Sequence, residues 1–192
     1  MKNRKLFTLV LAAMFLAVGL ILPLFTGQIK QIGNMLLPMH IPVLLCGLVC
    51  GWQYGMGIGF ILPLMRSVIF GMPVMYPTAA AMAVELAAYG FIAGFMYSRA
   101  RWQCIRSLYR CILCAMIGGR ILWGASMSLL MYFGGGGAFT FEMFIAGAFL
   151  NAIPGIVVQL ILIPAIMLAL DKTHLVHFKK HKKQEVRADA AK

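Results

Sequence analysis

Acidic residues are scarce in this chain, and charge of either sign is rare. Of the 192 residues, 5 are Asp or Glu and 17 are Lys or Arg, and together they make up 11% of the sequence. A soluble globular domain carries about 25% charged residues, so this composition excludes an ordinary soluble domain. The apolar share of 62% instead indicates a chain that lies mostly within a lipid bilayer.

Sequence signatures of catalysis and of metal binding are also missing. The chain has no H-E-x-x-H pair, no nucleophile elbow and no phosphate-binding loop. The pair Cys111-x-x-Cys114 has no second pair and no histidine near it in the sequence, so we interpret it as filler in an apolar helix. We therefore predict no enzyme, no cofactor and no metal site, and any uphill transport would need a partner ATPase or an ion gradient.

Six apolar segments fill most of the chain. About 20 helical residues cross ~30 Å of hydrocarbon, so we predict an all-α membrane bundle within residues 1–171. The predicted spans are residues 6–25, 36–51, 55–70, 78–97, 111–133 and 143–170. The basic start followed by an apolar run is also typical of a signal peptide, but no polar mature domain follows. Residues 172–192 are expected to form a basic, disordered cytoplasmic tail.

The basic residues cluster in the tails and one loop. Three lie before the first span, four between the fourth and fifth spans and seven in the C-terminal tail, which is 14 of the 17. Cytoplasmic loops of membrane proteins carry such an excess, so both termini are predicted to be cytoplasmic. This placement favours topogenic charge over binding of nucleic acid.

Ionisable residues inside apolar spans are costly and are functional candidates. Under the predicted topology Arg66 lies ~7 Å and Glu85 ~12 Å below the outer surface, and Asn151 lies at a depth similar to Glu85. With Arg120 in the middle of its span, these residues predict a binding pocket that opens outward. Two alternatives stay open: Arg66 and Glu85 could form a structural ion pair, or Arg66 alone could extend to the interface.

Four further residues are weaker candidates for contact with a substrate. His40 stands between two prolines and could equally cap a helix, and Asn34 could cap the second span. Tyr89 and Trp123 lie within spans, where packing is the more common role of an aromatic residue.

Small residues recur at helical spacing. Gly47-x-x-x-Gly51-x-x-x-Gly55-x-x-x-Gly59 and Gly90-x-x-x-Gly94 predict close helix packing within the bundle. Ala13-x-x-x-Ala17 lies on the first span, which has no charged residue to turn inward, so it could face another protein.

Taken together, these features resemble the substrate-binding (S) components of energy-coupling factor vitamin transporters. The resemblance covers nearly the whole chain and is most specific at residues 37–51, L-P-x-H-I-P-V-L-L-C-G-L-V-C-G, with Tyr54-Gly55 after it. It implies a multi-pass protein of a bacterial plasma membrane that captures a vitamin or similar micronutrient from outside. It also implies docking through Ala13 and Ala17 on a membrane coupling subunit, with two ATP-binding subunits supplying energy.

The substrate stays open at this stage. Nickel and cobalt members of the family carry Met-His at the N-terminus, whereas this chain begins Met-Lys-Asn, which argues against a metal substrate. Arginine in excess over glutamate suits a small anionic, zwitterionic or polar heterocyclic molecule. The alternatives from other classes are a solitary secondary carrier or channel, and an intramembrane enzyme that uses Glu85 with Arg66.

Overall fold

Helices form almost the whole of the computed structural model, which describes residues 2–26, 38–100, 105–134 and 153–172. The helices are α1 (Lys2–Thr26), α3 (His40–Cys50), α4 (Trp52–Phe70), the π-helical turn η1 (Met75–Ala79), α5 (Ala80–Arg99), α6 (Ile105–Phe133) and α8 (Ile153–Lys172). No strand occurs in these ranges. The predicted all-α membrane bundle is confirmed.

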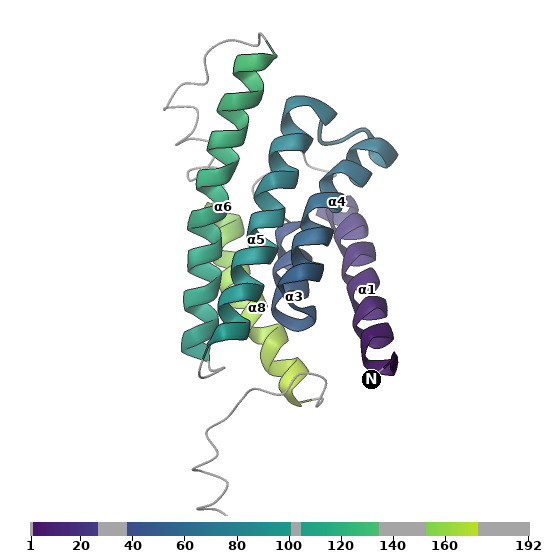
Figure 1. Cartoon of the computed structure of the whole chain (residues 1–192), viewed down its shortest axis with the longest axis vertical. Helices are drawn as coiled ribbons and strands as arrows, with labels where there is room; N and C mark the ends of the chain where they lie inside the picture. The colour runs from purple at the N-terminus through teal and green to yellow at the C-terminus, as the bar shows by residue number, and fades with distance from the viewer. Residues whose placement is uncertain (1, 27–37, 101–104, 135–152, 173–192) are drawn as a thin grey trace, which may run out of the picture.

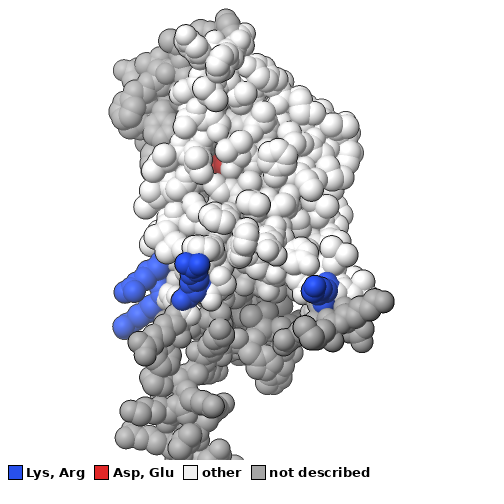
Figure 2. Space-filling view, in the orientation of Figure 1, with Lys and Arg blue, Asp and Glu red and all other residues white. Residues whose placement is uncertain are grey.

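Helix α5 occupies the centre of the bundle (Figure 1). It contacts α3, α4 and α6, while α1 packs on α3 and α4, and α8 packs on α3 and α6. The N-terminus of α1, the end of α5 and the start of α6 all lie at the lower end of the view in Figure 1. The same end carries the exposed lysines and arginines (Figure 2), while the upper surface is nearly free of charge on the face shown.

Within the second predicted span, residues 36–51, the part that the structure describes contains a shorter helix, α3. Five helices are long and apolar enough to cross a membrane, namely α1, α4, α5 with η1, α6 and α8, whereas α3 has only 11 residues. Eleven residues extend about 16 Å, roughly half of the hydrocarbon core. Helix α3 is buried from His40 to Leu48, so its neighbours, rather than lipid, surround its ends.

Two predicted boundaries also shift. The predicted spans 36–51 and 55–70 leave a connection of three residues between them, but Trp52 already begins α4 and only Gly51, whose φ of 100° suits glycine, separates it from α3. Helix α6 begins at Ile105 rather than at residue 111, so Arg106 and Arg110 lie on a helix and not in a loop. The N-terminal part of the sixth predicted span and the basic tail lie outside the described residues.

Glycines join α3, α4 and α5 at the centre. A Cβ atom at Gly90 would lie 2.2 Å from the carbonyl oxygen of Gly55, and one at Gly47 would lie 2.5 Å from that of Gly90. A Cβ at Gly59 would meet the Leu86 carbonyl oxygen at 2.3 Å. The expected packing of small residues within the bundle is confirmed at these positions, because only glycine admits such close backbones.

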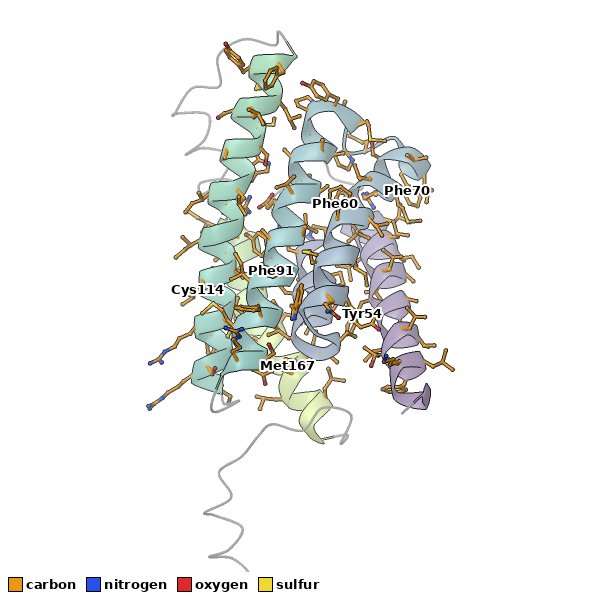
Figure 3. The ribbon with its side chains drawn as sticks, viewed as in Figure 1. Tyr54, Phe60, Phe70, Phe91, Cys114 and Met167 are labelled. Atoms are coloured by element: carbon orange, nitrogen blue, oxygen red, sulfur yellow. The ribbon has the colours of Figure 1, made fainter. Side chains whose placement is uncertain are left out.

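An apolar cluster is formed by α3, α5, α6 and α8. It includes Leu44 and Leu48 of α3, Ile112 of α6, and Ile163 and Met167 of α8, all buried. Figure 3 labels Met167 in the lower part of the bundle. The polar side chains of interest lie one helical turn above this cluster, toward the upper end.

Candidate functional site

Glu85 is the central residue of a buried polar cluster. It lies on α5 with 1% of its surface exposed. Nη1 of Arg120, on α6, is 3.0 Å from Oε1 of Glu85, and Nε2 of His40 is 3.4 Å from the same oxygen. Three helices thus bring together a carboxylate, a guanidinium and an imidazole. Glu85 supplies the carboxylate, Arg120 the guanidinium and His40 the imidazole. Pairing is what permits these charges inside an apolar bundle.

The short helix α3 is what delivers His40 to this position. His40 is the first residue of α3, and Pro42 fits in the first turn because its missing N–H would have no partner there. The His40 ring meets the Tyr89 ring edge-on, with centroids 4.9 Å apart. Tyr89 follows Glu85 by four residues on α5, so both side chains lie on the same face of that helix.

Gly119 makes room for Tyr89 against α6. A Cβ at Gly119 would lie 2.4 Å from Cδ2 of Tyr89. Gly119 directly precedes Arg120 on α6. The Tyr89 ring therefore packs against α6 next to the residue that carries the guanidinium. The sequence analysis did not single out Gly119, since its value depends on which face of α6 meets α5.

Gln159 of α8 is a second residue outside the predicted site. Its side chain is wholly buried, with 0% exposed. Gln159 lies one helical turn from Ile163, a member of the apolar cluster. His40 and Arg120 likewise lie one turn from members of that cluster, which are Leu44 and Met116. Helical register therefore places Gln159 at the level of the polar cluster. Its signal in the sequence was an amide within an apolar segment.

Several polar atoms of this level have no hydrogen-bond partner among the described residues. They are His40 Nδ1, Arg120 Nε, Arg120 Nη2, Gln159 Nε2 and Gln159 Oε1. Native proteins pair about 90% or more of their buried polar atoms, and an unpaired one costs about 1–3 kcal/mol. So many unpaired donors and acceptors at one level are suited to a polar ligand.

Arg66 does not join this cluster, so the interpretation of Arg66 and Glu85 as an ion pair is wrong. Arg66 donates from Nη1 to the carbonyl oxygen of Leu20 in α1 at 3.1 Å. Its guanidinium also lies 5.5 Å from the ring centroid of Phe70, which Figure 3 labels near the upper end of α4. Arg66 therefore ties α4 to α1.

The other predicted site residues divide into two groups. Trp123 is half-buried on α6, three residues beyond Arg120. Asn34 and Asn151 lie outside the described residues. The structure thus brings together Glu85, Arg120, His40 and Tyr89, and it separates Arg66 from them.

Helix α1 has an outer face that no described helix covers. Ala12 and Gly19 are buried against the bundle, while Ala13 and Ala17 are exposed. The exposed apolar side chains around these two alanines are Leu9, Val10, Met14, Val18 and Ile21.

Comparison with known proteins gives one decisive match. The model of the family described as ECF transporter, substrate-specific component, matches residues 7–167, which is most of the chain. The chain belongs to this family. As a member, it is a multi-pass membrane protein of a transport system, and the resemblance inferred from the sequence is confirmed. No match is found among curated proteins or among solved structures.

Proposed function

We propose that this chain is the substrate-capture subunit of an ATP-driven importer for a small vitamin-like molecule. The observation that carries this proposal is the buried cluster of Glu85, Arg120 and His40 inside an otherwise apolar S-component bundle. Its unpaired atoms match a small polar molecule rather than an ion stream, because a channel would line its path with exposed polar groups. The chain itself catalyses no reaction in this proposal.

The orientation follows from the basic end of the bundle. Lys5, Arg99, Arg106 and Arg110 are exposed there, which supports a cytoplasmic location for this end in a bacterial plasma membrane. Arg120 lies ten residues, about 15 Å, beyond Arg110, and Glu85 lies about 21 Å from Arg99. In a hydrocarbon core of ~30 Å the cluster then lies at or beyond the midplane. A substrate would enter from outside.

Energy would come from partners. The exposed alanines Ala13 and Ala17 suit close approach of a helix from a membrane coupling subunit, which two ATP-binding subunits would drive. The bilayer and the small substrate complete the set of partners, and nucleic acid is not among them.

Proteoliposomes can test whether the chain binds the substrate while partner subunits supply the energy. The chain would be reconstituted alone, or with a coupling subunit and two ATPases, and supplied with a bacterial metabolite extract. We expect mass spectrometry to find an extract component accumulated in the lumen only with the full module and ATP. Accumulation by the chain alone under an ion gradient would instead establish a secondary carrier and overturn the proposal.

A further inference from the structure

The polar cluster also indicates the chemical class of the substrate, an inference that rests on the proposed function. We propose that the captured molecule carries a carboxylate, and that the free edge of the Arg120 guanidinium binds it. Two observations support this proposal: the unpaired nitrogens of Arg120, and the position of the α3 N-terminus beside the cluster.

The guanidinium of Arg120 is only half used within the described chain. Nη1 contacts Glu85 at 3.0 Å, and the Tyr89 side chain also interacts with the guanidinium. Nε and Nη2 are buried and have no hydrogen-bond partner among the described residues. Nε and Nη2 form one edge of the guanidinium, and their N–H groups point in parallel. Such an edge matches a planar group with two acceptor oxygens, as in a bidentate arginine–carboxylate pair. The Arg120 side chain is about 6% exposed, so water does not readily reach this edge.

The cluster itself is electrically balanced, because the Glu85 carboxylate offsets the charge of the Arg120 guanidinium. Arg66, the other buried cation among the described residues, lies apart beside α1. The preference for a carboxylate therefore comes from the direction of the free donors and not from a surplus of charge. A cation would meet only N–H donors at this edge and is disfavoured.

The N-terminus of α3 adds to the preference for an anion. Helix α3 has 11 residues, begins at His40, and its N-cap Met39 provides no side-chain hydrogen bond. Both residues are buried, so the partial positive charge of this helix end lies inside the bundle beside the cluster. His40 Nε2 is 3.4 Å from Glu85 Oε1, and the same oxygen contacts Arg120 Nη1, so the residue that begins α3 and Arg120 share one carboxylate.

The experiment compares a bacterial metabolite extract before and after its carboxylates are blocked. Carbodiimide and methylamine convert carboxylates into neutral amides, and a third sample is treated with phosphatase. Binding is measured as the rise in the thermal denaturation midpoint of the purified full-length chain. We expect the untreated and phosphatase-treated extracts to stabilise the protein, and the carboxyl-blocked extract to have no effect.

Each other outcome has a distinct meaning. Equal stabilisation by blocked and untreated extracts overturns the carboxylate proposal and leaves substrate capture standing. Loss of stabilisation after phosphatase treatment alone overturns it in favour of a phosphate. No stabilisation by any extract contradicts substrate capture itself, and with it this inference.

Two arginine variants localise the effect. Arg120→Lys keeps the positive charge beside Glu85 but removes the two-donor edge. We expect it to weaken binding of the stabilising extract fraction about 10- to 100-fold, the size expected from losing hydrogen bonds to a charged group. Arg106→Lys, at an exposed position of α6, is the matched control and should bind normally. Unchanged binding by a folded Arg120→Lys would overturn the assignment to Arg120, and the extract comparison stands even if that variant does not fold.

Discussion

Small residues serve opposite purposes at the centre of this bundle and on α1. At the centre Gly47, Gly55 and Gly90 face inward and let the backbones of α3, α4 and α5 touch. On α1, Ala13 and Ala17 face outward, where no described helix meets them. Gly55 and Gly59 on α4, and Gly90 and Gly94 on α5, have the same four-residue spacing as Ala13 and Ala17. This spacing therefore indicates packing within the chain in one place and an open contact surface in the other. The two cases differ only in how each helix is rotated about its axis, which decides whether its small residues face the bundle or the outside.

The two buried arginines divide in the same way. Arg120, at the centre, has a carboxylate partner and a free edge, whereas Arg66, beside α1, is satisfied by a backbone carbonyl and an aromatic ring. Under the proposed function Arg120 binds the ligand, whereas Arg66 links α4 to the peripheral helix α1. The predictions below test this contrast, in order of decreasing effect on the stability of the folded chain.

Removing the central carboxylate should have the largest effect. Glu85→Ala leaves the Arg120 guanidinium buried without its partner, and breaking a buried pair in this way costs about 3–5 kcal/mol. The free energy of unfolding in mixed detergent–SDS micelles measures the loss. Glu85→Gln keeps an acceptor oxygen near Arg120, so it should lose less. Equal stability of Glu85→Ala and the parent chain would contradict the ion pair.

A methyl group at the glycine contact should have the next largest effect. Gly90→Ala places a Cβ 2.2 Å from the Gly55 carbonyl oxygen, which is backbone and cannot turn aside. Overpacking of this kind costs about 1–3 kcal/mol. Gly57→Ala in α4 is the matched control, because nothing lies within 4 Å of its Cβ, and it should retain full stability in the same unfolding assay. A tolerated Gly90→Ala would mean that the helices are further apart than the structure has them.

Arg66→Met should have a smaller effect than either. It removes the hydrogen bond to Leu20 and the contact with Phe70, but it strands no opposite charge. We expect a loss of about 1 kcal/mol in the same assay, the typical net value of one hydrogen bond. A loss as large as that of Glu85→Ala would show that Arg66 has an acidic partner after all.

The sequence was informative about which residues matter and less so about how they pair. Apolar runs predicted the helical bundle, and the cost of burying charge selected Glu85 and Arg120 from the sequence alone. Their pairing could not be predicted, because it depends on the rotation of α5 against α6. Arg66 carried the same signal as Arg120 but turns toward α1 instead. Asn34 and Asn151 remain predictions.

The short helix α3 was missed for a related reason. An apolar run of 16 residues predicts a span whether lipid or protein surrounds it, and the run does not indicate where its helix begins. Gln159 and Gly119 were missed because a single amide or glycine in an apolar helix gains meaning only from the neighbour that it meets.

The outer face of α1 provides the last test, where the folded chain should be least affected. Ala17→Trp adds a large ring at an exposed position, and such surface changes usually stay within about 0.5 kcal/mol. Substrate binding should therefore be normal. Close packing of membrane helices requires small side chains, so docking on the coupling subunit should fail and ATP-driven uptake should be lost. Ala165→Trp, at an exposed position of α8, is the matched control and should support uptake. Normal uptake by Ala17→Trp would show that α1 is not the docking helix. The small residues of α1 would then be exposed without a contact function, unlike the glycines at the centre.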